Sequence, residues 1–242
     1  DADGNVLGYL HEPQGTNLCI ASNPNDFTSS ARVAITNDFS TSPISGQDSV
    51  QVLQAAGQTN AGAIYTASIT FTAASYVIQF RAKDAGKRYL RVRETSSGGS
   101  KDSVFDLQTG VASSLNAGHS GLVIVDEGDG WFTYSFTLTG TAVGGLVYFF
   151  VSDVGTVNAT VIDDSLGFEL AGVQVELGTA ATSLIHTFGA EATRQADAVS
   201  ATLPFPLTEE CTLLWEGEPL THGTTQEVIL ILTDSVGSYA HT

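Results

Sequence analysis

The chain has 242 residues and carries nine Lys and Arg against 26 Asp and Glu, a formal net charge of −17. This balance argues against nucleic acid as a partner, because binding phosphate backbones requires many basic side chains. No apolar run reaches membrane-spanning length and no signal peptide is visible, so we do not expect membrane insertion either.

The composition favours an all-β protein. Hydrophobic residues make up 42% of the chain, enough for a substantial core, while charged residues make up only 14%. Glycine is abundant, with 25 residues, and long amphipathic helical patterns are absent. The chain opens on Asp1 and contains no methionine, so we expect a piece of a longer polypeptide. Cys19 and Cys211 each lie in an apolar run, which favours buried free thiols over a disulfide.

Short apolar runs recur at the spacing of a β-sandwich. They predict strands at residues 16–22, 33–36, 49–54, 63–71, 76–83, 89–95, 103–107, 122–125, 131–139, 146–152 and 168–177. Turn-rich segments separate these runs. The run at 131–139 alternates apolar and polar residues, which predicts one face in the core and one in water. The run at 146–152 is apolar on both faces, which predicts a central, covered strand.

After residue 177 the periodicity fades, and near residue 198 a new pattern begins. We therefore expect a lead-in at 1–15, an antiparallel jelly-roll β-sandwich at 16–197, and a short β extension at 198–242. The last part would hold the first strands of a second β domain or an oligomerisation extension. Two strands alone bury too little to be stable.

Basic side chains are concentrated in one segment. Six of the nine lie between positions 81 and 93: Arg81, Lys83, Lys87, Arg88, Arg91 and Arg93. Two alternating runs around a Gly-containing turn predict a β-hairpin with residues 84–88 as its loop. Arg81 would then lie opposite Arg91, and like charges at opposed positions are destabilising. An anionic group, from the chain itself or from a ligand, is expected beside them.

This predicted hairpin provides the candidate binding site. Its members are Arg81, Lys83, Tyr89, Arg91 and Arg93. Tyr89 would offer a ring for a sugar to stack on, while the arginines would bind hydroxyls or carboxylates, the latter in a bidentate way. The alternative is that side chains of the same protein neutralise the arginines on a solvated sheet face. The candidates for that role are Gln174, Glu176, Glu94 and Asp106.

Other candidate sites are weaker. Trp131 is either a stacking platform or a structural aromatic that covers the core. Asp126, Glu127 and Asp129 could bind calcium through converging oxygens, although their spacing fits an ordinary acidic turn better than an EF-hand. Asp163 and Asp164 raise the same question. We therefore expect no cofactor, with structural calcium as the open alternative.

The sequence offers no catalytic signature. The five histidines are dispersed, without zinc-binding spacing. A nucleophile elbow, a phosphate loop and a dinucleotide fingerprint are all absent. Glu12, Glu94 and Glu176 could meet in space as the paired carboxylates of a glycosidase, but nothing distinguishes them. We predict that the chain is not an enzyme.

Several segments, in this order, resemble the carbohydrate-binding-module-like jelly-roll domains of bacteriophage tail fibres, tail spikes and other virion appendages. They are YLHEPQGTNLCIAS, ASITFTAASYVIQFRAKDAGKRYLRVRE, FDLQTG, DGWFTYSFTLTG and VQVELGTAATSLIHTFGAEATRQADAVSATLP. Together they extend over most of residues 7–204. In such proteins a second, concanavalin A-like lectin sandwich often follows, and residues 205–242 resemble only its first strands. Related modules bind ligands on a concave sheet and commonly hold a structural calcium.

The resemblance implies an extracellular virion module that binds a bacterial surface polysaccharide, contacts other virion proteins and forms a homotrimer. A purely structural or decoration module of the tail or capsid, whose sheet face packs on neighbouring subunits, is the alternative. An accessory domain of a secreted carbohydrate-active enzyme is a third interpretation, less favoured because no catalytic domain is present.

Overall fold

The computed structural model describes residues 12–96, 99–141, 143–157, 161 and 165–197, together with the backbone of two strands near the C-terminus. The chain divides into two compact units, residues 1–197 and 198–242. In the second unit β17 (Leu230–Thr233) pairs antiparallel with β18 (Ser238–His241). The run at 211–220, which also predicts a strand, lies outside the described residues. No described helix is both long and apolar enough to cross a membrane.

The first unit is built almost entirely of strands. They are β1 (Gly15–Asn17), β2 (Thr28–Ser29), β3 (Val33–Thr36), β4 (Val50–Gln54), β5 (Ala63–Tyr65), β6 (Ile69–Thr70), β7 (Ser75–Ala85), β8 (Tyr89–Glu94), β9 (Lys101–Asp106), β10 (Val111–Ser114), β11 (His119–Gly128), β12 (Trp131–Thr139), β13 (Gly144–Gly145), β14 (Val147–Ser152), β15 (Gly167–Leu177) and β16 (Ala192–Arg194). A single 3₁₀ turn, Pro24–Asp26, is the described helical element.

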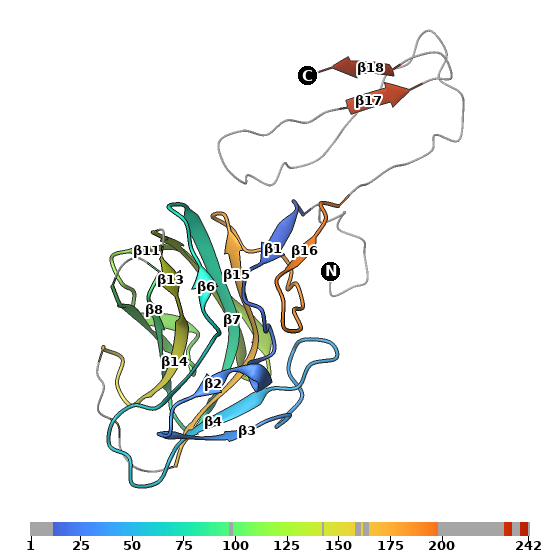
Figure 1. Ribbon diagram of the computed structural model, residues 1–242. Coiled ribbons are helices and arrows are strands. Elements are labelled where there is room, and N and C mark those ends of the chain that lie inside the picture. The colour runs from blue at the N-terminus through green and yellow to red at the C-terminus, as the bar shows by residue number, and fades with distance from the viewer. Residues whose placement is uncertain are drawn as a thin grey trace. The chain divides into compact units, whose positions relative to one another are not determined.

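Most of these strands form two antiparallel sheets (Figure 1), and β6 pairs with β13 in a separate two-stranded sheet. The eight-stranded sheet has the order β11-β12-β7-β15-β1-β16, and β4 and β3 continue from the other half of β15. The six-stranded sheet has the order β10-β9-β8-β14-β5-β2. The predicted all-β antiparallel sandwich of jelly-roll type is confirmed.

The hydrophobic core lies between the two sheets. Phe80 of β7 packs against Tyr134 of β12 in its own sheet, with ring centroids 5.3 Å apart. It also meets Phe105 of β9 and Phe149 of β14, from the six-stranded sheet, at 5.5 and 5.2 Å. All four rings are fully buried, because each strand turns its apolar face inward.

β15 is the most deeply buried strand, with only Leu177 exposed. It carries a β-bulge between Ala171 and Gln174 where it pairs with β7. Gly172, at the bulge, has a φ of +48°, in the left-handed region that favours glycine. The bulge therefore depends on a residue without a side chain.

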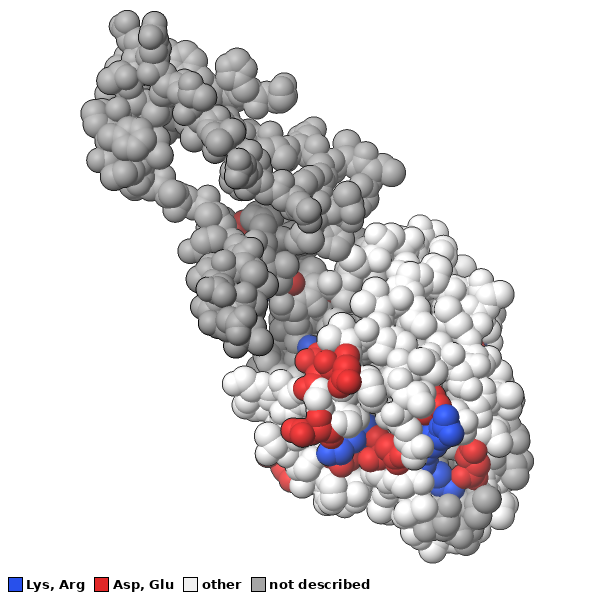
Figure 2. Space-filling view, turned by 180° about the vertical axis from the view of Figure 1, so that it is seen from behind, with Lys and Arg blue, Asp and Glu red and all other residues white. Residues whose placement is uncertain are grey.

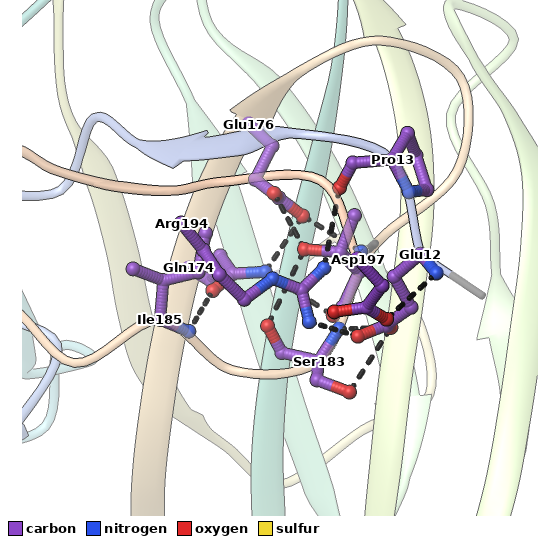
Figure 3. Close-up of polar contacts among 9 residues, drawn as sticks. Glu12, Pro13, Gln174, Glu176, Ser183, Ile185, Arg194 and Asp197 are labelled. Carbon is purple, nitrogen blue, oxygen red and sulfur yellow. Dashed lines mark hydrogen bonds and ion pairs between the residues drawn. The ribbon is translucent and has the colours of Figure 1, made fainter. Parts of the chain in front are cut away.

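The entry and exit of the sandwich are fastened together. β1 pairs with β16, so that Gly15 lies opposite Arg194. Beyond this pair, Glu12 forms an ion pair with Arg194 (Figure 3). The Glu12 amide donates to the Asp197 carboxylate, and the Asp197 amide donates to the Glu12 carbonyl. The Ser183 amide donates to the Glu12 carboxylate at 2.7 Å. The two ends of the described sandwich thus share one polar cluster.

Candidate functional site: two outer sheet faces

Strand alternation orients the predicted site residues outward. On β7 the inward residues Ile78, Phe80 and Ala82 are fully buried, while Arg81 and Lys83 point away from the core. On β8 Leu90 and Val92 are fully buried in the same way. Tyr89, Arg91 and Arg93 form the outer set of β8. The predicted alternation is correct in both strands.

The predicted hairpin is wrong. β7 pairs with β12 and β15, whereas β8 pairs with β9 and β14 in the other sheet. Arg81 lies opposite Thr133 and Ala171, not opposite Arg91. The expected repulsion between the two arginines across a shared strand pair therefore does not arise.

The connection between β7 and β8 explains the difference. Gly86 has a φ of +102° and bridges to Gly167 at the start of β15, where the Lys87 amide donates to the Gly167 carbonyl at 2.9 Å. The Lys87 side chain is buried and forms an ion pair with Asp153. The segment thus crosses from one sheet to the other. In a hairpin the apolar sides of both strands would face the same way; across the sandwich they face each other and fill the core.

On the outer face of the eight-stranded sheet, Lys83 borders a depression of about 600 Å³. Its lining consists of Ser40, Thr41, Ser42, Pro43, Lys83, Glu127, Gly128, Asp129 and Trp131. The Lys83 ammonium lies 6.0 Å from the centre of the Trp131 ring. We call this feature the Lys83 depression.

Trp131 supports this face from beneath. It is only 3% exposed and packs with Ile44, Ala171 and Leu184 in a small apolar cluster separate from the main core. The structural interpretation of Trp131 is therefore the better one, although the cluster lies outside the sheet and not between the sheets. A ring so deeply buried offers a ligand an edge and not a stacking face.

Charges around the Lys83 depression nearly balance. Glu127 accepts a hydrogen bond from Thr133 at 2.5 Å, and Glu169 accepts one from Ser49 at 2.8 Å. Burial lowers the pKa of Arg81 below its ordinary value, and the nearby Glu127 carboxylate partly opposes the shift. The Arg81 Nη1 and the Gln79 Oε1 are buried without a hydrogen-bond partner among the described residues. These two atoms are therefore unsatisfied beneath this face.

The outer face of the six-stranded sheet carries Arg93 and Arg91, and Asp102 binds both. Arg93 donates to Asp102 through two nitrogens, at 2.9 and 3.0 Å, in a bidentate pair. The Nε of Arg91 lies 3.7 Å from the same carboxylate. Tyr89 lies under the guanidinium of Arg88, whose carbon is 5.3 Å from the ring centre. The expected aromatic platform is therefore capped by a neighbouring side chain.

Of the proposed neutralising residues, Asp106 forms an ion pair with an arginine of the basic segment, Arg88. This ion pair holds the pKa of Asp106 below its usual value despite the opposing effect of burial. In Figure 2 acidic and basic side chains lie side by side in a band across one face. Asp102 was missed, although pairing the predicted strands 89–95 and 103–107 across their Gly-rich turn would have placed it beside Arg93.

Each of the three glutamates accepts hydrogen bonds from its own chain. Glu94 lies in the interior, bound by Ser96. Glu176 accepts hydrogen bonds from Thr182 and from Gln174, near the Glu12 cluster (Figure 3). Glu176 and Glu12, but not Glu94, bind the segment after β15 at Thr182 and Ser183.

The calcium alternative stays a prediction. No group of three or more His, Cys, Asp or Glu side chains within the described part of the chain is arranged to hold a metal ion. Asp163, Asp164 and Cys211 lie outside that part. Cys19 is a buried free thiol, as predicted, and burial raises its pKa to about 12.

No family model and no curated protein matches the chain. Among solved structures it is similar to the CBM22-1 xylan-binding domain of Xyn10C from Paenibacillus barcinonensis, with 15% identity and a TM-score of 0.37. The similarity covers 69% of this chain and 94% of that domain. Xylan binding is a property of that domain.

Proposed function

We propose that the chain is a non-catalytic carbohydrate-binding module of a bacteriophage virion appendage, such as a tail fibre, that attaches to a bacterial surface polysaccharide. The observation that carries the binding role is the Lys83 depression. Its volume, about 600 Å³, falls within the range of small-ligand sites, roughly 300–1,000 Å³. The phage setting rests on the order of the sequence segments that resemble appendage modules.

The chemistry of the depression suits a polyhydroxylated ligand. Sugar hydroxyls both donate and accept hydrogen bonds, so a site for them needs donors and acceptors close together. Lys83 supplies a donor, while Asp129 and Glu127 supply acceptors and Ser40, Thr41 and Ser42 add hydroxyl groups. The near balance of charge favours a neutral sugar at this face. Binding of this kind requires no cofactor.

A single shallow site binds weakly, and the proposed assembly offsets this. In a homotrimer, three copies of the depression would engage one polysaccharide surface, and avidity would exceed the affinity of each site. Attachment to other virion proteins and exposure outside the cell complete this proposal.

A glycan array on the full chain, followed by titration of any bound glycan, tests the proposal. We expect Lys83→Gln and Asp129→Asn each to weaken binding about tenfold or more, the loss of one charged hydrogen bond of about 1.5–3 kcal/mol. The matched controls are the exposed Arg32→Gln and Asp26→Asn, which should bind as the parent does. Equal binding by all four variants would place the sugar elsewhere.

A structural or decoration role is the second candidate. Phe188 is 85% exposed and Leu177 63% exposed, the highest values among the large hydrophobic side chains of the described residues. A sheet face or one of these side chains would then pack on a neighbouring subunit. Hydrogen exchange on the assembled particle distinguishes the roles, because only packing would protect these segments relative to the free chain.

A further inference from the structure

The outer face of the six-stranded sheet bears a second organised surface. Strand pairing places Tyr65, Tyr148, Arg93 and Asp102 in one row across β5, β14, β8 and β9. The next row contains Phe150 and Arg91. We call these six residues the aromatic–arginine face.

The aromatic part of this face is partly accessible. Tyr65, Tyr148 and Phe150 are each half-buried. The Tyr65 and Tyr148 ring centres are 5.0 Å apart, and Tyr148 stacks on Phe150 at 5.7 Å. Three adjoining rings form an apolar strip beside charged groups. The Phe150 ring is covered by two guanidinium groups, so Tyr65 and Tyr148 are the rings that can accept the C–H face of a sugar, since an aromatic ring is apolar on its face.

The charged part has more positive than negative charge. Arg91 and Arg93 both lie over the Phe150 ring, at 4.2 and 5.3 Å, and share the single carboxylate of Asp102. Arg91 is only 4% exposed, and its Nε is buried without a hydrogen-bond partner among the described residues. Burial lowers the pKa of Arg91, Asp102 opposes this, and the neighbouring Arg93 adds to it. Two guanidinium groups thus compete for one anion.

We infer that the aromatic–arginine face is a second, separate binding surface, which takes a glycan that carries a carboxylate, of the uronic or sialic acid type. The rings select a sugar, and the unmatched positive charge selects an anionic one. A carboxylate suits the planar guanidinium better than a hydroxyl does, because it accepts two parallel hydrogen bonds. A nucleic acid is disfavoured, since the chain as a whole carries a net charge of −17 and would repel an extended phosphate backbone.

This surface is independent of the Lys83 depression, because β8 and β7 belong to different sheets. Failure of one site therefore leaves the other untouched. The probes are polygalacturonate, alginate and polysialate, each beside its carboxyl-reduced form, with biolayer interferometry on the full chain. We expect at least one acidic polymer to bind and its reduced form to bind at least about tenfold more weakly, the loss of one charged hydrogen bond.

Two variants assign the binding to this face. Arg93→Gln removes the more accessible guanidinium, with 31% of its side chain exposed, and Tyr148→Ala removes the central ring. Each should weaken binding about tenfold or more, while Arg32→Gln, the same change at a remote exposed arginine, should not. Circular dichroism confirms that each variant folds. Arg93→Lys should bind less tightly than the parent and more tightly than Arg93→Gln. Lysine keeps the positive charge but cannot donate two parallel hydrogen bonds to a carboxylate.

Four results of the binding experiments would overturn the inference, and a fifth result would come from self-association. They are no binding of any acidic polymer, equal binding of the reduced polymers, unchanged binding by both Arg93→Gln and Tyr148→Ala, and equally tight binding of single-stranded DNA, which would indicate simple ion exchange. Self-association abolished by Arg93→Gln would instead assign this face to a second copy of the chain, and would equally refute a glycan site.

Discussion

The buried carboxylate of Glu94 allows a test of how much a charged group in the interior contributes to the stability of the fold. Glu94 ends β8 on its inner face and is fully buried. It accepts hydrogen bonds from the Ser96 amide at 2.6 Å and the Ser96 hydroxyl at 2.5 Å, and lies 3.6 Å from the Nε2 of His119. His119 belongs to β11 of the other sheet, and its Nδ1 is 2.7 Å from the Ser103 hydroxyl. The network therefore connects the two sheets at one end of the core.

Replacing Glu94 with Gln keeps the shape and removes the charge. Burial alone would raise the pKa of Glu94, but the His119 side chain 3.6 Å away and the hydrogen bonds from Ser96 outweigh it and hold the pKa below the ordinary 4.5. The fold thus favours the ionised form. A hydrogen bond to a charged group contributes about 1.5–3 kcal/mol and a neutral one about 1 kcal/mol, so two bonds predict a loss of about 1–4 kcal/mol at neutral pH.

The contribution of Glu94 to the free energy of unfolding should depend on pH. Since the folded pKa is lowered, the stabilisation by Glu94 is fully present above pH 4.5 and is lost as the pH falls through the folded pKa. Urea unfolding of the parent and of Glu94→Gln, at neutral pH and in steps below pH 4.5, should show a difference that shrinks with acidity. The exposed Glu191→Gln is the control and should change stability by less than about 0.5 kcal/mol. A Glu94→Gln variant as stable as the parent at neutral pH, or a difference that grows in acid, would refute this reasoning.

Three further predictions concern the core, the bulge and the buried thiol. Phe80→Ala should lower the free energy of unfolding by about 3–5 kcal/mol in urea titration, and a loss below 1 kcal/mol would contradict the packing of its three ring partners. Gly172→Ala should lower the free energy of unfolding by about 1–3 kcal/mol in the same assay. The residue has a positive φ, and a Cβ there would lie 2.1 Å from the Ile44 side chain. The control Gly99→Ala, which has open space around it, should leave the stability nearly unchanged. Burial raises the pKa of Cys19 to about 12, so the thiol should resist iodoacetamide at pH 8 in the folded chain and react after unfolding. Peptide mass spectrometry measures the labelling, and rapid labelling of the folded chain would contradict the burial of Cys19.

The positions of these strands could be predicted from the sequence, because a strand depends on the local alternation of apolar and polar residues. The predicted run at 131–139 is β12, and the run at 33–36 is β3. The run at 146–152 is a central strand, as predicted, although its outward Tyr148 and Phe150 are half-buried and not covered. The run at 63–71 contains two short strands, β5 and β6, which pair with different partners.

The pairing between strands was harder to predict from the sequence, because it depends on contacts between residues far apart in the chain. A short Gly-containing turn is compatible both with a hairpin and with a crossing between sheets. What distinguishes them here is the pairing of β7 with β12 and β15, and the buried Lys87–Asp153 ion pair at the crossing. The aromatic strip was missed for the same reason, since Tyr65 and Tyr148 are neighbours only through the pairing of β5 with β14.

The crossing of the chain between the sheets also changes what the basic segment can do. In a hairpin, its charges would have formed one strongly positive surface. Divided between two sheets, Arg81 and Lys83 join Glu127, Asp129 and Glu169, whereas Arg91 and Arg93 share Asp102 alone. The two faces should therefore respond differently to salt, because screening weakens attraction between net charges and hardly affects hydrogen bonds to a neutral sugar. Binding at the aromatic–arginine face should fall as ionic strength rises, and binding in the Lys83 depression should persist, so that one salt titration separates the two proposed sites.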